Sequence, residues 1–236
     1  MLIVKALAEY DPDVIILIEY RTKSSAAIQK DLFGKGWVHI DSTRPERSDN
    51  GICVLSRIPF DRHGASLAPA ENAIRWLDIN FPSQGLGLGI LYVPGSTSGS
   101  RSLPRGHVKR RFWDAVLSAA EARINQPFMF VGDFNTGLHW VDEREKTFFS
   151  ADQFERLSTT GWVDSWRYFH GERLEPTWYS VLKGGVRGNP FRIDHAFVSP
   201  VLLPRLRDCR YSHSEREENI SDHSILLVEL ANQEVS

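Results

Sequence analysis

Apolar residues along this chain fall into short runs of the kind that strands and a few helices produce. Near the start, Ile3, Leu7 and Tyr10 recur at helical spacing, and an Asp-Pro pair then interrupts the pattern. Residues 14–18 are all apolar, which predicts a buried strand after this opening helix. Similar runs predict further strands at Ile52–Leu55, Trp76–Phe81, Leu86–Val93, Phe128–Val131, Arg192–Val198 and Ile225–Leu230.

Two more helices are predicted between these strands. The first places apolar side chains on one face, namely Val108, Phe112, Ala115, Ala119 and Ala122. The second should begin at Ser150, whose side chain can cap the amide of Gln153 while Gln153 reaches back. Phe154 and Leu157 would then face inward, and Gly161 would end the helix.

The ratio of strands to helices determines the expected fold class. Many strands and few helices suit an α/β protein in which two packed sheets carry helices on their outer faces. Periodicity alone leaves the order of these layers open. Residues 1–236 contain no internal repeat, no low-complexity run and no linker rich in Pro, Gly or Ser. We therefore expect one domain with a long functional loop near residues 94–106.

Composition and charge narrow the class of protein. With 236 residues, 42% hydrophobic and 25% charged, the chain has the composition of a globular protein. Its net charge of −2 means that any affinity for nucleic acid must be local. The first apolar run is too short to span a bilayer, and Lys5 and Glu9 interrupt any signal-peptide core. We expect a cytoplasmic protein with no membrane contact, no obligate protein partner, and reduced thiols at Cys53 and Cys209.

Acidic and amide side chains recur at the ends of the predicted strands. Glu19 follows the run at 14–18, Asp133 and Asn135 follow the run at 128–132, and Asp222-His223 precedes the last strand. An enclosed carboxylate is costly to desolvate unless a cation or hydrogen bonds compensate it. Together with Asp194 these residues offer hard oxygen ligands, which favour Mg²⁺, or Mn²⁺, over zinc. Each residue alone is more typical of a turn or a helix cap than of a metal ligand, so the prediction depends on the set.

Seven sequence blocks, in order, carry a resemblance to a known family. The chain resembles the endonuclease/exonuclease/phosphatase superfamily, which includes exonuclease III-type repair nucleases, pancreatic-type deoxyribonucleases and inositol-polyphosphate phosphatases. The resemblance covers about residues 11–230 and implies a four-layer α/β/β/α sandwich of the DNase I-like type. The blocks are PDVIILIEYR, NGICVLSRIPF, LGILYVPGS, VGDFNTG, EPTWYS, FRIDHAFVS and ISDHS.

The resemblance implies roles for the acidic and amide residues. Glu19 matches the metal-binding glutamate of the family, and Asp222 matches an additional aspartate near the metal. Asp133 and Asn135 in VGDFNTG resemble the pair that activates and orients the attacking water.

It also implies roles for a histidine and two aromatic residues. Asp194 resembles the carboxylate that hydrogen-bonds the catalytic histidine, which would be His223. Tyr92 lies where the family often has a tyrosine that touches the scissile phosphate. Trp178 lies where repair nucleases place an aromatic wall around a flipped-out sugar. In an arbitrary chain, such aromatic residues more often belong to the core or to its rim.

Basic residues gather in two stretches that could contact substrate phosphates. Residues 101–111 carry six basic or histidine side chains and no acidic one, and we single out Arg105 and Lys109. Arg192 lies just beyond a Gly-rich stretch at 184–188 and is a smaller candidate of the same kind. A charged helix surface explains the longer stretch equally well.

The chain departs from the family pattern in two places. Relatives begin with a strand that bears an asparagine beside the metal-binding glutamate, and no such strand precedes the opening helix here. Either a start codon assigned too late or a real truncation would produce this, and we favour the late start. The second departure is His195, where relatives commonly carry an aromatic residue after the aspartate.

From these residues we expect a Mg²⁺-dependent phosphoesterase that hydrolyses phosphodiester bonds in DNA or RNA. Two alternatives stay open. One is a phosphatase that acts on a small phosphorylated metabolite by the same chemistry. The other is a catalytically impaired relative that binds nucleic acid without turnover. The sequence does not distinguish among phosphate esters, because one scaffold hosts several activities.

Overall fold

The computed structural model describes residues 2–64, 66–95 and 106–233, and its largest element is a six-stranded sheet. Within this sheet β6 and β7 run parallel, and the other neighbours run antiparallel. The strands, in spatial order, are β4 (Asp61–Arg62), β5 (Trp76–Phe81), β6 (Leu86–Tyr92), β7 (Phe128–Asp133), β11 (Asp194–Val198) and β8 (Val163–Asp164).

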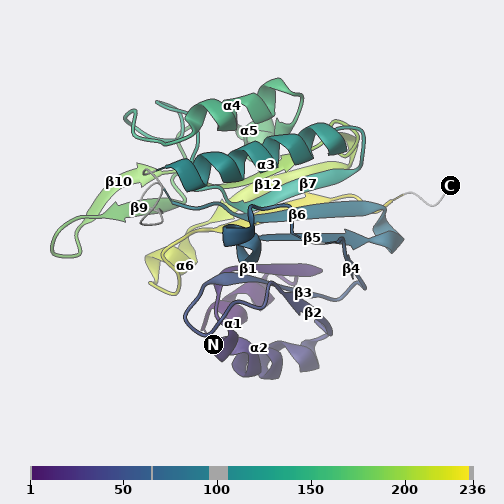
Figure 1. Cartoon of the computed structure of the whole chain (residues 1–236). Coiled ribbons are helices and arrows are strands. Elements are labelled where there is room, and N and C mark those ends of the chain that lie inside the picture. The colour runs from purple at the N-terminus through teal and green to yellow at the C-terminus, as the bar shows by residue number, and fades with distance from the viewer. Residues whose placement is uncertain (1, 65, 96–105, 234–236) are drawn as a thin grey trace.

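A second layer of strands packs on one face of this sheet and is divided into two parts. One part is a three-stranded sheet in the order β1 (Val14–Tyr20), β3 (Gly51–Ser56) and β2 (His39–Ser42). The other is the pair β12 (Leu206–Ser212) and β13 (Ile225–Leu230). Apolar side chains of both parts join one core cluster with the six-stranded sheet. A separate hairpin of β9 (Trp178–Val181) and β10 (Arg187–Phe191) projects from the body (Figure 1).

Helices cover both outer faces of the two sheet layers (Figure 1). On one side α1 (Leu2–Glu9) and α2 (Ser25–Leu32) cover the three-stranded sheet, and on the other α3 (His107–Arg123) and α4 (Ala151–Thr159) cover the six-stranded sheet. The structure therefore has the expected four layers, α/β/β/α. The remaining helices are short, namely α5 (Ser165–His170), α6 (Ser214–Glu217) and 3₁₀ turns at Thr22–Ser24, Phe33–Lys35, Ala70–Arg75, Pro82–Gln84 and Leu203–Arg205.

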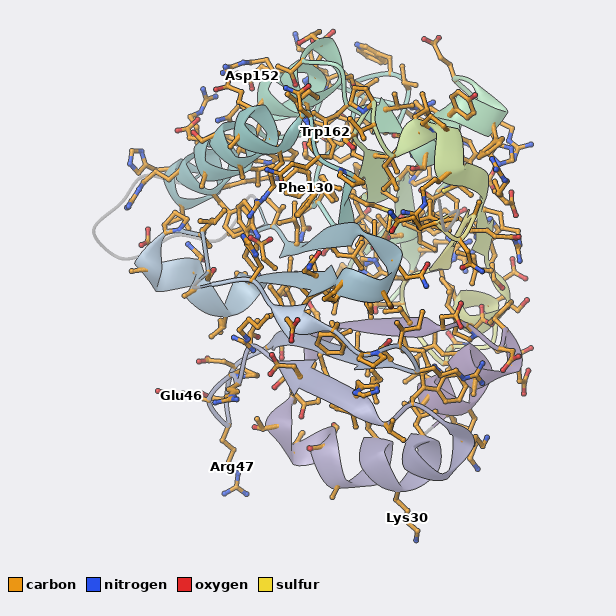
Figure 2. The ribbon with its side chains drawn as sticks, turned by 90° about the vertical axis from the view of Figure 1, so that its right-hand side faces the viewer. Lys30, Glu46, Arg47, Phe130, Asp152 and Trp162 are labelled. Atoms are coloured by element: carbon orange, nitrogen blue, oxygen red, sulfur yellow. The ribbon has the colours of Figure 1, made fainter. Side chains whose placement is uncertain are left out.

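The six-stranded sheet is apolar on both faces, which explains its continuous apolar runs. Because side chains alternate along a strand, Phe128 and Phe130 of β7 face α3, and Met129 and Val131 face the second strand layer. Figure 2 shows Phe130 and Trp162 inside the protein, and their ring centroids are 4.8 Å apart. The charged side chains labelled there, such as Lys30 and Arg47, extend away from the body.

The predicted elements agree with the structure except at their edges and at one cap. Every predicted strand is present, although the fourth ends at Tyr92 and the sixth begins at Asp194. The predicted capping box at Ser150 is not formed. Ser150 makes no side-chain cap, and Gln153 instead donates to the Arg110 carbonyl and the Asp114 carboxylate. Most of the loop at 94–106, including Arg105, lies outside the described residues.

The buried face of α3 is also rotated from its predicted position. Val108, Phe112 and Ala119 are buried as expected, whereas Ala122 is exposed. The helix instead buries Trp113 and Ala120 completely against α4 and the sheet. Alanine fits either environment, so the large Trp113 side chain decides which face of the helix turns inward.

Two simpler expectations can be compared directly with the structure. Cys53 and Cys209 are buried and free, as predicted. Within the three described ranges, no helix is long and apolar enough to cross a membrane.

Arg192 does not lie on the surface, contrary to its expected role as a phosphate contact. Its side chain is fully buried, and its Nε atom lies 2.5 Å from a carboxylate oxygen of Asp142. One of its terminal nitrogens lies 2.5 Å from Asp164, which also caps α5 by accepting from two backbone amides. Burial alone would favour neutral carboxyls, but Arg192 holds the pKa values of Asp142 and Asp164 below their usual range. Arg192 therefore joins the loop after β7 to α5 and cannot bind substrate.

We predict that Arg192→Met lowers the free energy of unfolding by about 3–5 kcal/mol at pH 7, because it leaves buried carboxylates without their cation. The depressed pKa values mean that this ionic stabilisation is complete above about pH 4 and is lost as the pH falls further. Urea unfolding at pH 7 and at about pH 2 should therefore show a smaller difference between wild type and variant at the lower pH. Arg156→Met, on the exposed face of α4, is the control, and an equal loss from both variants would contradict the assignment.

Candidate active site

Three neighbouring strands place Tyr92, Asp133 and Asp194 side by side. Tyr92 is paired in register with Asp133 across β6 and β7, and Asp133 is paired with Asp194 across β7 and β11. Each lies two residues from an apolar side chain that faces the second strand layer, such as Val131 or Ala196. The interior between the two strand layers is therefore apolar along most of its length and becomes polar at this end.

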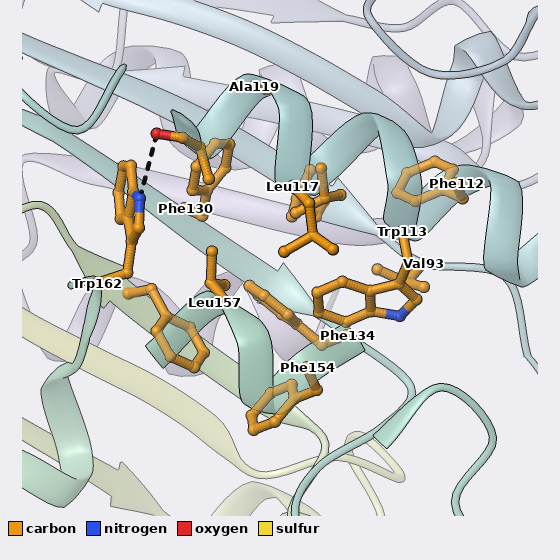
Figure 3. Packing of buried hydrophobic residues seen from close by; sticks show 14 of the residues in the cluster. Val93, Phe112, Trp113, Leu117, Ala119, Phe130, Phe134, Phe154, Leu157 and Trp162 are labelled. Atoms are coloured by element: carbon orange, nitrogen blue, oxygen red, sulfur yellow. Dashed lines mark hydrogen bonds between the residues drawn. The ribbon is translucent and has the colours of Figure 1, made fainter. Parts of the chain in front are cut away.

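The backbone around Asp133 is held by a glycine and by a buried ring. Gly132 has a φ of +141°, and a Cβ there would lie 2.1 Å from the Leu91 carbonyl oxygen, so only glycine fits. On the other side of Asp133, Phe134 is fully buried. Its ring centroid is 5.8 Å from that of Trp113 and 6.3 Å from that of Phe154. Figure 3 shows Phe134 packed among these buried rings. The segment that carries Asp133 is thus anchored in the core under α3 and α4.

Asn135 fixes the carboxylate of Asp133 through two hydrogen bonds. The Asn135 backbone N–H donates to one Asp133 oxygen at 2.8 Å, and its side-chain Nδ2 donates to the other at 2.7 Å. Nδ2 also donates to the Val93 carbonyl. Asn135 has a left-handed φ of +50°, a conformation that asparagine tolerates better than most residues. The predicted pairing of Asp133 with Asn135 is therefore present as a rigid unit.

Lys109 lies beneath this unit and not on the protein surface. Its side chain is buried, and Nζ donates to the Asn135 carbonyl at 2.5 Å. Burial lowers the pKa of Lys109 to about 8, and the charge of Asp133 opposes that shift. The expected surface contact of Lys109 with substrate is not supported. We infer instead that this side chain supports the active-site backbone from below.

Burial and charge give Asp133 an unusual pKa. Burial of its carboxyl, reinforced by the charge of Asp194, raises the pKa of Asp133 to about 7. His223, the Asn135 amide and Lys109 act in the opposite direction. A carboxylate with a pKa near neutrality is suited to accept a proton at physiological pH.

His223 is paired with Asp194, as the sequence predicts. Nδ1 of His223 lies 2.9 Å and 3.1 Å from the two carboxylate oxygens of Asp194. Burial opposes charge on the imidazole, but Asp194, Asp133 and Asp222 outweigh it and raise the pKa of His223 to about 10. The ring is therefore an imidazolium at neutral pH and can donate a hydrogen bond or stabilise negative charge.

Glu19 reaches the same cavity from the second strand layer. It sits at a register shift in β1, with a left-handed φ of +58°, and its carboxylate accepts a hydrogen bond from the Tyr92 hydroxyl at 2.6 Å. Burial and this bond raise the pKa of Tyr92 to about 12. The guanidinium of Arg75 lies 4.0 Å from the centroid of the Tyr92 ring. No sequence motif marked Arg75, because its position over the Tyr92 ring depends on the packing of Ala70–Arg75 against β3 and β5.

Trp178 lies beside His223, and a second tryptophan is exposed in the loop that follows Asn135. The ring of Trp178, on β9, is half-buried and lies 6.3 Å from the His223 ring, in agreement with its predicted place beside the site. Trp140 is 69% exposed in the loop that follows Asn135, and it lies in none of the seven sequence blocks that carry the family resemblance. Its left-handed φ of +64° and its exposure together distinguish it from the buried tryptophans of the core. Asp222, the second predicted metal ligand, is exposed beside His223.

The second departure, His195, lies in the core behind the site. It is fully buried, its Nε2 lies 2.9 Å from the Thr136 carbonyl oxygen, and its ring centroid is 4.7 Å from Phe154. The imidazole thus occupies an aromatic position and also hydrogen-bonds the backbone after Asn135. Its presence leaves the Asp194–His223 pair intact.

The chemistry of the donors suits a hard divalent cation. Glu19, Asp133 and Asp194 are carboxylates that line one cavity, and the charge of Asp194 contributes to the raised pKa of Asp133. Among the described residues, no three acidic, histidine or cysteine side chains converge closely enough to form a complete metal site. Mg²⁺ is typically held by one or two carboxylates and keeps several waters, so this arrangement fits such an ion.

Comparison with known proteins agrees with this fold. A sequence model of the endonuclease/exonuclease/phosphatase family matches residues 2–223. A search of curated proteins found no match. Among solved structures, the 3′ phosphatase NExo from Neisseria, bound to a product DNA hairpin, superposes with a TM-score of 0.79 at 22% identity and covers 97% of this chain and 93% of its own. An AP endonuclease from Archaeoglobus fulgidus gives 0.80 at 18% identity, with the same coverage.

A third solved structure, the 3′–5′ exonuclease NExo from Neisseria meningitidis, has a TM-score of 0.76 and 22% identity over 98% of this chain and 96% of its own. At these identities the three structures show a shared DNase I-like fold. Because the family model spans nearly the whole chain, the protein belongs to the endonuclease/exonuclease/phosphatase family. Membership supports hydrolysis of phosphate esters as its class of activity.

We predict that Lys109→Met raises the pKa of Asp133 above its wild-type value of about 7, because the variant removes a buried positive charge that favours the carboxylate. Carboxyl ¹³C NMR titration, assigned with Asp133→Asn, measures the shift. Arg110→Met removes an exposed charge one residue further along α3 and should leave the titration unchanged. An unchanged pKa in Lys109→Met would refute the electrostatic contribution of Lys109.

Proposed function

We propose that the protein is a Mg²⁺-dependent nuclease that hydrolyses phosphodiester bonds in DNA or RNA, with Mn²⁺ as an alternative metal. One observation carries the proposal. Asp133, fixed by Asn135, lies next to Asp194 in register, and Asp194 in turn holds the His223 imidazolium. A base and a cationic donor thus line the same cavity, which is the requirement for attack of water on a phosphate ester.

The residues of the site have distinct parts in the proposed reaction. Asp133 would accept the proton of the attacking water, because its raised pKa suits proton transfer near neutral pH. Asn135 keeps the Asp133 carboxylate in a single orientation. His223 would donate to a phosphoryl oxygen, and Asp194 keeps the ring charged and oriented. Tyr92, whose hydroxyl already bonds Glu19, would position the scissile phosphate.

The metal would be held by Glu19, with Asp222 as a second candidate ligand. When bound, such an ion would neutralise charge on the phosphate oxygens. The assignment of the ligands stays a prediction, as does the expected cytoplasmic location. The ligand assignment depends on the oxygen chemistry of the donors and on the family resemblance.

Aromatic and basic side chains near the site favour nucleic acid over a small phosphate ester. Trp178 lies beside His223, and the hairpin that carries it also holds Arg187, whose guanidinium lies 4.5 Å from the Tyr179 ring centroid. Half-buried rings at a protein surface can stack on bases, and guanidinium groups contact phosphates. The three solved relatives are themselves a 3′ phosphatase bound to a DNA hairpin, an AP endonuclease and a 3′–5′ exonuclease.

We predict Mg²⁺-dependent, EDTA-sensitive cleavage of nucleic acid that falls by about 10²–10⁴-fold in Asp133→Asn. The substrates are plasmid DNA, a duplex with an abasic site, single-stranded DNA and RNA, and a duplex with a 3′-phosphate. Asp152→Asn, on exposed α4, is the matched control and should retain full activity.

The other outcomes separate the alternatives. Phosphate release without strand scission would assign a phosphatase, and binding of the same oligonucleotides without turnover would assign a non-catalytic relative. Cleavage that survives both EDTA and Asp133→Asn would refute the proposed mechanism.

A further inference from the structure

A series of four half-buried rings begins beside His223. The ring centroid of Trp178 lies 6.3 Å from that of His223 and 5.9 Å from that of Phe191, its partner in register across β9 and β10. The Phe148 centroid lies 5.5 Å from that of Phe191, and the His139 centroid lies 6.5 Å from that of Phe148. We call Trp178, Phe191, Phe148 and His139 the ring strip. Each of the four side chains is partly accessible to solvent.

A buried carboxylate fixes the outer half of the ring strip. Glu143 is only 1% exposed, and its Oε1 atom lies 2.6 Å from Nδ1 of His139 and accepts the Phe148 backbone N–H at 3.0 Å. Glu143 also forms an isolated backbone bridge with Phe191. The loop that carries His139 and Phe148 is therefore tied to β10. Rings that are already held in place lose little conformational entropy when a ligand binds.

Trp140 follows the outer end of the ring strip and is unusually accessible. It comes directly after His139, and at 69% exposed it is the most accessible tryptophan, tyrosine or phenylalanine among the described residues. Its φ of +64° lies in the left-handed region, which is costly for a bulky residue. A large ring that is both strained and exposed contributes little to the core and is typical of a ligand contact.

Exposed positive charges accompany these rings. Arg144 and Lys146 are exposed in the loop that leads to Phe148, with Glu145 between them. Arg187 is exposed on β10. Surfaces that bind a nucleic-acid strand combine the same two kinds of side chain, because rings stack on the bases while cations attract the phosphates.

We infer that the ring strip and Trp140 bind the bases of an unpaired nucleic-acid strand that extends from a phosphate at His223. This inference deepens the proposed nuclease function and rests on it, because that function places the phosphate beside His223. In a duplex, neighbouring bases cover both faces of each base. An unpaired strand leaves those faces free to stack on protein rings.

The spacing of the rings also favours an unpaired strand over a duplex. Neighbouring centroids of the ring strip are 5.5 Å, 5.9 Å and 6.5 Å apart. Successive bases along a duplex strand are about 3.4 Å apart. Bases stacked on successive rings therefore cannot also stay stacked on one another, so the strand must be separated from its complement where it binds.

Binding of labelled oligonucleotides without Mg²⁺ tests the inference. The probes are an oligothymidylate of about 12 nucleotides, an oligouridylate of the same length and a blunt duplex of the same length, each followed by fluorescence anisotropy in EDTA. We expect at least one of the two unpaired strands to bind about tenfold more tightly than the duplex, or better. The tighter of the two unpaired strands identifies whether the sugar is that of DNA or RNA.

Substitutions of Trp140 provide a matched pair. Trp140→Leu keeps an apolar side chain but removes the flat ring, and it should weaken binding of the unpaired strand by about 5–100-fold. Trp140→Phe keeps a ring and should retain most of the affinity. Tyr168→Leu, which removes a ring 57% exposed on α5 and outside the ring strip, is the control and should bind as the wild type does.

Two results would overturn the inference, namely equal or tighter binding of the duplex, and unchanged affinity in Trp140→Leu. The outcome is separable from that of the proposed function, because the assay contains no cleavage step. Ring-dependent binding without any cleavage in Mg²⁺ would support the strand site and refute the nuclease. Cleavage of a duplex with no preference for an unpaired strand would support the nuclease and refute the strand site.

Discussion

The register of β7 with its two neighbours is the constraint on which the site depends. Because side chains alternate along a strand, one registration turns Met129 and Val131 toward the second strand layer and also turns Asp133 the same way. The same alternation on β6 and β11 brings Tyr92 and Asp194 to that face. A slip of one residue would bury the three polar groups under α3 and leave apolar residues in their place.

The protein contains two groups of buried charges, and they shift the pKa values of their carboxyl groups in opposite directions. Around Arg192, opposite charges satisfy one another, and the pKa values of Asp142 and Asp164 fall below their usual range. Around Asp133, burial and the charge of Asp194 prevail over the nearby cations, so the pKa of Asp133 rises toward neutrality. The first balance stabilises the loop after β7, and the second leaves a carboxyl that can gain and lose a proton.

Much of this protein follows from its sequence because local patterns report local structure. Apolar runs predicted the strands, and ordered motifs identified Asp133, Asn135, Asp194 and His223, whose pairing the structure contains. The prediction for Arg192 was wrong because the local sequence does not show which partner a guanidinium binds. An arginine beside a Gly-rich segment can bind a substrate phosphate, but here it binds two carboxylates that lie 28 and 50 residues away in the sequence. For the same reason, the position of Lys109 under Asn135 and of Arg75 over Tyr92 could not be predicted. The partner of a charged side chain depends on packing between segments that are far apart in the sequence, and the burial of that side chain then shifts its pKa. Only the tertiary structure could therefore determine these contacts.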